Sequence, residues 1–244
     1  MNEKRGKRPE RAEVPTPEVA ERGAGGKTLD RRLFMQLLAF TDCSDPSVLV
    51  EPMRQADVAG AIYADVNDPR GVALLAMSED PAFFPGPWRQ LLNAAPFDQL
   101  TPRPEMTMFG RTYSIGYEPD LEETLFDRPR RHALNPDWPW CVWYPLRRSG
   151  AFEQLDREER MSILREHGTI GRGFGEADFA HDVRLACHGL DRADNDFVIG
   201  LMGSQLHPLS ALVQRMRSTT QTSQYLEHLG PFFVGRAVWQ SDQG

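Results

Sequence analysis

Cysteine is scarce in this 244-residue sequence, and the three that occur, Cys43, Cys141 and Cys187, lie far apart. An odd number without paired metal-site spacing argues against a disulfide framework and favours a reduced, intracellular protein. Long apolar runs are also missing, because none approaches the ~18 residues of a membrane span. Residues 1–8 are charged, but no apolar segment follows them, so we expect no secretory signal and a cytoplasmic location.

Positive charge is in short supply. The 28 Lys and Arg residues face 35 Asp and Glu residues, which gives a net charge of −7. Residues 1–28 hold seven of the basic and five of the acidic residues, so the remainder has 21 against 30, or −9. Nonspecific nucleic-acid binding needs an excess of cations facing the phosphates, so this function is disfavoured.

The pattern of apolar and turn-forming residues divides the chain into four parts. We expect a disordered tail at 1–28, an N-terminal half at 29–118, a connector at 119–138 and a C-terminal half at 139–244. In the first half we expect strands at 33–40, 71–77 and 105–116, and a helix that begins at Pro52 and carries Met53, Ala56, Gly60 and Tyr63.

The two halves show the same order of strands and helices. This predicts an α+β protein built from two duplicated ferredoxin-like (split βαβ) halves, whose antiparallel sheets form a dimeric α+β barrel-like core.

The most informative stretch surrounds His167. Asp156 is the expected N-cap of a helix, and acidic residues follow in its first turn, where the helix dipole favours negative charge. His167 lies on the edge of the apolar face, and the glycines at 168, 171, 173 and 175 leave room for a large, flat group. A lone histidine of this kind is more often a hydrogen-bonded core residue than a metal ligand, although neutral imidazole is the commonest metal ligand. The pattern alone leaves both interpretations open.

Several segments of the second half together resemble one protein family. They match in the same order over roughly a hundred residues, at 144–148, 158–172, 189–191, 196–198, 216–217 and 230–235. On these segments the chain resembles the chlorite dismutase family of haem proteins, which includes the coproheme decarboxylases. The first half matches only in its order of elements.

The resemblance implies a role for four residues. His167 would be the proximal iron ligand of haem b or iron coproporphyrin III, and Tyr144 would be the redox-active residue beside a propionate. Arg148 matches a propionate-holding lysine, with Arg147 adjacent, and a guanidinium grips a carboxylate with two hydrogen bonds. Without the family, a half-buried strand tyrosine and two solvated arginines would be the simpler interpretation. The implied partners are a porphyrin, hydrogen peroxide or another small oxidant, and further copies of the chain, often five.

The chain also departs from the family pattern. Chlorite-splitting members carry a distal arginine, whereas the ungapped match here is Ala180, with His181, Asp182 or Arg184 as alternatives; chlorite chemistry is therefore disfavoured. Gln221 stands where the family has a glutamate near the proximal histidine. A neutral group there makes the imidazole a weaker donor to iron.

These observations predict peroxide-dependent decarboxylation of iron coproporphyrin, or a related peroxidase-like oxidation. A haem-binding or haem-sensing protein without turnover is one alternative. A ferredoxin-like interaction module that has lost haem is the other.

Overall fold

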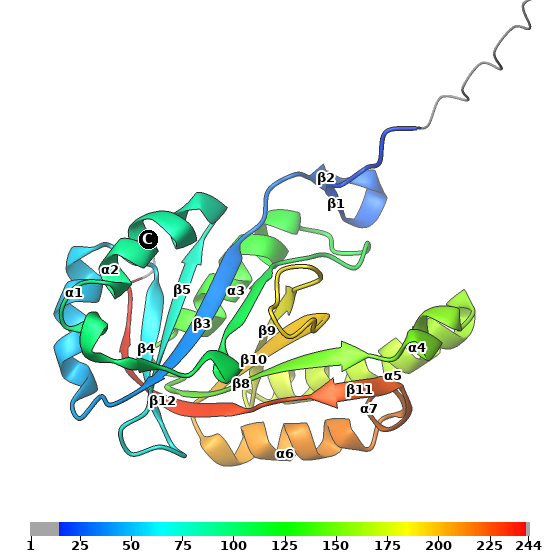
Figure 1. Ribbon diagram of the computed structural model, residues 1–244. Helices are drawn as coiled ribbons and strands as arrows, with labels where there is room; N and C mark the ends of the chain where they lie inside the picture. Colours follow the sequence, from blue (N-terminus) through cyan, green and yellow to red (C-terminus); the bar gives the residue numbers. More distant parts are fainter. Residues whose placement is uncertain (1–14, 243–244) are drawn as a thin grey trace, which may run out of the picture.

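The computed structural model describes residues 15–242, which form antiparallel strands flanked by helices (Figure 1). The first half consists of β3 (Phe34–Thr41), α1 (Val50–Gln55), β4 (Gly60–Asp65), β5 (Val72–Ser78), a π-helical turn (Phe84–Trp88) with α2 (Arg89–Leu92), β6 (Thr101–Pro102) and β7 (Met108–Arg111). The second half consists of β8 (Trp140–Arg148), α4 (Gly150–Gln154), α5 (Arg157–Glu176), β9 (His181–Ala186), β10 (Phe197–Gly203), α6 (Leu206–Arg217), α7 (Thr220–Tyr225), β11 (Leu226–Leu229) and β12 (Phe233–Gln240).

Both halves have the same strand order. When the four main strands of each half are numbered along the chain, the orders β7-β3-β5-β4 and β12-β8-β10-β9 both read 4-1-3-2. The halves join through β4–β12 and β7–β9, so the path of strands closes on itself. The predicted α+β class, with two duplicated antiparallel halves, is confirmed.

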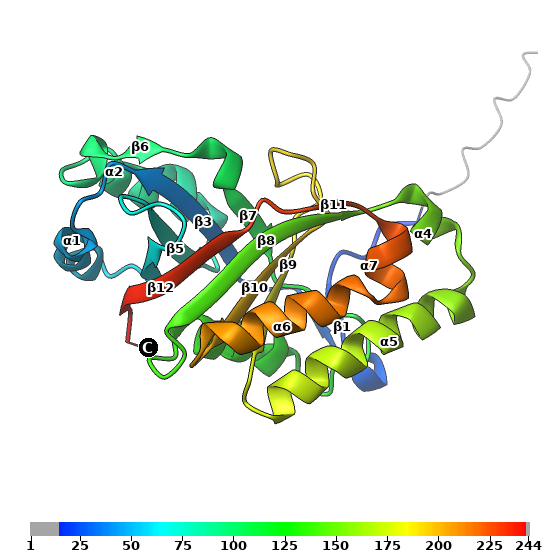
Figure 2. The ribbon, with the colours of Figure 1, turned by 90° about the horizontal axis from the view of Figure 1, so that it is seen from below.

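Three apolar clusters follow from the alternation of side chains along the strands. The interior of the closed sheet holds fully buried residues of both halves, among them Leu37, Leu75 and Trp143. The outer face of the first half packs under α1 and α2, and the outer face of the second half packs under α6. Figure 2 shows α5 and α6 lying side by side along the strands of this second outer face.

The helix predicted from Pro52 to Tyr63 is wrong in its second part. The helix ends at Gln55, and residues 60–65 form β4 between β5 and β12. The reason is tertiary, because Ala61, Ile62 and Tyr63 are fully buried between two neighbouring strands. The strand predicted at 105–116 is reduced to β7, because residues 104–106 form a 3-10 turn.

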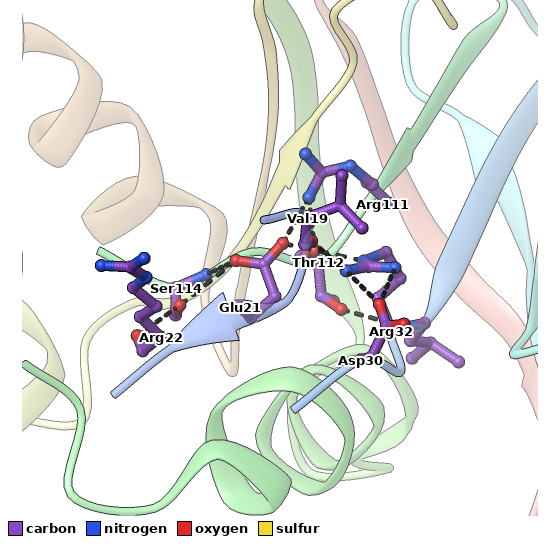
Figure 3. A network of polar contacts seen from close by, with 9 residues as sticks. Val19, Glu21, Arg22, Asp30, Arg32, Arg111, Thr112 and Ser114 are labelled. Atoms are coloured by element: carbon purple, nitrogen blue, oxygen red, sulfur yellow. Dashed lines mark hydrogen bonds and ion pairs between the residues drawn. The ribbon is translucent and has the colours of Figure 1, made fainter. Parts of the chain in front are cut away.

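The predicted disordered tail does not hold for residues 21–28. Residues 1–14 lie outside the described part, but β1 (Glu21–Arg22) and β2 (Thr28–Leu29) pair as a small sheet. Figure 3 shows how Glu21 attaches this arm, because its carboxylate accepts hydrogen bonds from Arg111 Nη1 at 2.7 Å and from Ser114 N at 2.9 Å. Arg32 Nε lies 3.7 Å from the same carboxylate.

The predicted connector contains α3 (Arg128–Leu134), whose Ala133 and Leu134 are buried in the interior cluster. It is therefore a packed element as well as a link between the halves. The exact domain boundaries stay a prediction.

Candidate functional site

His167 projects from α5, and the sequence explains why this helix forms. Asp156 is the predicted N-cap, and its Oδ1 accepts a hydrogen bond from Glu159 N at 2.9 Å. Although α5 is 20 residues long, Ile163 is its only buried residue. The helix packs chiefly against α6 and α7, whereas α6 packs directly on β8 and β10. The inward face of α5 is therefore turned towards the sheet without being packed tightly onto it.

The hydrogen bonds of His167 define which ring nitrogen carries the proton. Nδ1 lies 3.2 Å from Thr219 Oγ1, and the Thr219 hydroxyl donates its own proton to the Met216 carbonyl at 2.8 Å. Thr219 Oγ1 therefore accepts from Nδ1–H, which leaves the lone pair on Nε2. Within residues 15–242, Nε2 has no hydrogen-bond partner.

The ring of His167 is also held in its neutral form. Burial lowers the pKa of His167, and the positive charge of Arg148 lowers it further. A neutral imidazole with a free Nε2 lone pair is the state in which histidine binds metals.

Tyr144 lies across from α5, on the second outer face of the sheet. It pairs with Ile199 on β10, and Ile199 pairs in turn with Arg184 on β9, so the three form one row across the strands. The Tyr144 side chain is buried, and its ring stacks on Phe232 with centroids 4.7 Å apart. Burial, and then the negative charge of Asp182, raise the pKa of Tyr144, so it is a neutral phenol at pH 7.

Arg148 ends β8 on the same face as Tyr144, two pairs of residues further along the strand. Its guanidinium lies between the rings of Phe152 and Phe197, at 4.7 and 4.6 Å from their centroids. Nε is buried without a hydrogen-bond partner, and Arg148 makes no ion pair within the described residues. Burial lowers the pKa of Arg148. A half-buried guanidinium with an unpartnered Nε and no ion pair is costly, so the arrangement fits a bound carboxylate.

Arg147 differs from Arg148 in its surroundings. Its guanidinium already pairs with Asp194 at 2.9 Å and lies 3.7 Å from Glu227. Both arginines line a cleft of about 490 Å³, whose other lining residues are Ser149, Gly150, Glu153, His188, Asp196, Phe197 and Glu227. The structure thus brings Arg148 to the face of Tyr144, and it gives Arg147 other partners.

The four candidates for the distal position differ in the face of the sheet on which they lie; they are Ala180, His181, Asp182 and Arg184. His181 faces the opposite side, where its ring stacks on Trp138 at 3.4 Å and its Nε2 lies 2.7 Å from Asp178 Oδ1. Ala180 is buried in the apolar cluster beneath α6 and offers no polar group. Asp182 and Arg184 remain, and both lie on the face of Tyr144.

Gln221 is buried in α7, and its Oε1 has no hydrogen-bond partner. The group that accepts from His167 Nδ1 is Thr219, which the sequence reasoning missed. Its N-cap pattern, in which Oγ1 accepts from Thr222 N at 3.4 Å, signals the start of α7 but not the contact with His167. The assignment of Gln221 to the cofactor stays a prediction.

Metal binding by side chains alone is not supported. Among the residues from 15 to 242, no group of three or more His, Cys, Asp and Glu side chains is placed to hold a metal ion. An iron bound at His167 would have to bring its other donor atoms with it, as an iron porphyrin does. The same part of the chain has no helix long and apolar enough to cross a membrane.

A closed α+β sheet, with one available imidazole on a loosely packed flanking helix, is suited to a flat cofactor that takes a single protein ligand. The family model of chlorite dismutase matches residues 103–238, which is more than half of the chain. The chain therefore belongs to the chlorite dismutase family.

Similar proteins agree with this assignment. A heme-binding protein from Thermus thermophilus superposes with a TM-score of 0.68 at 19% identity, covering 92% of this chain and 95% of that one. The chlorite dismutase from Candidatus Nitrospira defluvii in complex with imidazole gives a TM-score of 0.66 at 13% identity, covering 86% and 92%. At such identities these likenesses establish the fold alone.

A Haloarcula marismortui protein that is proposed to bind haem is 32% identical over 111 residues. The match covers 44% of this chain but only 16% of that much longer protein.

Proposed function

We propose that this chain binds haem b or iron coproporphyrin III between α5 and the sheet, with His167 as the axial iron ligand. The observation that carries the proposal is the state of this imidazole, which is neutral, bonded through Nδ1 to Thr219, and free at Nε2. The proposal is supported by membership of the family and by the names of the Thermus and Haloarcula relatives, which state or propose haem binding.

Arg148 would hold a propionate carboxylate of the porphyrin. Its buried, unpaired Nε and its place on the face of Tyr144 support this role. Arg147 would contribute less, because Asp194 and Glu227 already compensate its charge. Gln221 would line the proximal side together with Thr219, since both belong to the α7 segment.

For the reaction, we propose peroxide-dependent decarboxylation of iron coproporphyrin or a related peroxidase-like oxidation. A bound iron porphyrin would supply the chemistry that activates peroxide. Tyr144 would supply an electron and a proton, because its phenol is neutral, buried and on the sheet face across from His167. The stacked ring of Phe232 shields the phenol from water on one side.

One observation favours a second candidate, a haem-binding or haem-sensing protein without turnover. The acceptor at Nδ1 is a neutral hydroxyl rather than a carboxylate, so the imidazole is a weaker donor to iron. Weaker donation disfavours oxidised iron, which peroxide chemistry requires. A third candidate, an interaction module that has lost haem, has no such observation in its favour.

An absorption titration tests the proposal. The purified protein is titrated with haem and, separately, with iron coproporphyrin III, and peroxide is then added. We expect tight binding that is lost in His167→Ala and kept in the matched control His207→Ala, since His207 is an exposed residue of α6. Conversion to a product with fewer propionates, abolished in Tyr144→Phe, supports the enzyme. Binding without conversion supports the second candidate, and no binding refutes the role of His167.

The remaining partners belong to the same proposal. We propose a homo-oligomer, a pentamer by analogy with the family, and a cytoplasmic location. Light scattering coupled to size exclusion measures the first.

A further inference from the structure

The face of the sheet across from His167 carries two guanidinium groups in contrasting states. Arg148 has no ion pair in the described part of the chain, whereas Arg184 Nε lies 3.1 Å from Asp182 Oδ2. Asp182 and Arg184 are two residues apart on β9, so they point to the same side of the sheet. The residues between and after them, Val183 and Leu185, point into the buried interior.

Register places this pair on the same face as Tyr144, with the middle strand β10 between them. Arg184 shares a row with Ile199 and Tyr144, and Asp182 shares the next row with Leu201 and Val142. The charges of Arg184 and Asp182 both act on the pKa of His167, in opposite directions. Helix α5 flanks this outer face of the sheet (Figure 2), so the pair lies on the side that faces α5.

The pair is accessible, although Val183 and Leu185 of the same strand are buried. The Arg184 and Asp182 side chains are 42% and 46% exposed. A lone guanidinium at such a position would attract any anion that approaches the iron. A carboxylate in contact with it cancels most of that attraction, because the two opposite charges lie almost the same distance from the incoming ligand.

We propose that Asp182 neutralises Arg184 and thereby selects neutral over anionic ligands on the sheet side of the site. This inference rests on the proposed function and adds a specificity-determining residue to it. Peroxide is neutral at physiological pH, whereas chlorite and other oxyanions are charged. Asp182 thus disfavours oxyanion substrates even though an arginine is present on the distal face. Arg148, without a carboxylate partner, keeps its full charge for a carboxylate of the porphyrin.

A double-mutant cycle with fluoride and imidazole tests the inference. Protein loaded with ferric haem is titrated at low ionic strength, and affinities are read from the absorption spectrum. Asp182→Asn should tighten fluoride binding about tenfold, because it unmasks Arg184, and Arg184→Gln should weaken it by a similar factor. The double variant carries no net charge change, so its fluoride affinity should equal that of the unsubstituted protein. Imidazole is neutral, and its affinity should stay within about twofold throughout.

Asp178→Asn is the matched control. It removes one carboxylate from a nearby position, but Asp178 binds His181 on the opposite face of the sheet. Its effect on fluoride should stay below about threefold. The inference is overturned if Asp182→Asn gains no more fluoride affinity than Asp178→Asn, or if the gain survives in the double variant. Failure of the unsubstituted protein to bind haem would instead refute the proposed function, and this inference with it.

Discussion

Replacing Thr219 by valine removes the hydrogen bond that orients His167 while keeping the shape of the side chain. A buried N–H without a partner costs about 1–3 kcal/mol, and the lower half of that range applies here, because the contact is only part-buried and its length of 3.2 Å is at the long end of the normal range. Loss of the N-cap of α7 adds about 1 kcal/mol. We therefore expect the free energy of unfolding of the porphyrin-free protein to fall by about 2–3 kcal/mol.

Porphyrin binding should suffer as well, because the ring of His167 is no longer held in one tautomer and orientation. Loss of such an outer partner typically weakens a metal site by about 10–100-fold. The assay is the haem titration, paired with urea denaturation of the porphyrin-free protein. Thr219→Ser keeps the hydroxyl and should behave almost like the unsubstituted protein. Equal haem affinity in Thr219→Val, or an equal loss in Thr219→Ser, would refute the reasoning.

Three further predictions concern charged groups. Arg148→Gln should weaken binding of iron coproporphyrin about 10–100-fold without destabilising the porphyrin-free protein. Arg147→Gln should change the affinity less than about threefold. A larger loss from Arg147→Gln in the same titration would contradict the assignment of the propionate to Arg148. Glu21→Gln should lower the free energy of unfolding by about 1–3 kcal/mol, because three donors lose a charged acceptor. Arg22→Gln breaks only an exposed ion pair and should change the free energy of unfolding by less than about 1 kcal/mol; equal urea midpoints for the two variants would contradict the contribution of Glu21. Burial lowers the pKa of His132 in the folded protein. When the pH drops below the ordinary histidine value of about 6.5, the unfolded chain therefore binds more protons than the folded one, and the free energy of unfolding decreases. The urea midpoints at pH 7.5 and pH 5.5 should differ less in His132→Gln than in the unsubstituted protein.

The first half shows where sequence patterns fail for the fold. Met53, Ala56 and Tyr63 have helical spacing, yet Tyr63 belongs to a strand. The apolar run at 61–63 is also compatible with a buried strand, and periodicity in so short a window cannot separate the two. Pairing with β5 and β12 decides the outcome, and these partners lie elsewhere in the chain. The long, capped helix of His167 was predictable because its signals are local.

The candidate site likewise contains residues that local sequence patterns predict and residues that only tertiary contacts bring together. His167 and Tyr144 lie in continuous motifs, so their places could be predicted from the residues around them. Thr219 is 52 residues from His167 in sequence, and no local pattern reports that contact. The distal face depends on the phase of β9, where a shift of one residue exchanges His181 for Asp182. The observed pairing of β9 with β10 decides which of the two residues lies on the face of Tyr144.

The duplication explains why only one half is proposed to hold a porphyrin. In the first half, the space beneath the helices is filled by Phe84, Trp88 and Phe97, all of them buried. The helix after the first strand, α1, is short and places Met53 in this cluster. Its counterpart α5 is far longer and buries only Ile163.

The same fold thus appears once with its outer face covered by short helices and by Phe84, Trp88 and Phe97, and once with its outer face covered by α6 and by α5, which carries His167. In the second half, α5 buries only Ile163 and holds Ile170 and Phe174 half-buried against the cluster on this face, so a ligand between α5 and the sheet would add to this packing. A ligand that binds there only in the folded state would stabilise the protein by about 2.7 kcal/mol at a hundred times its Kd.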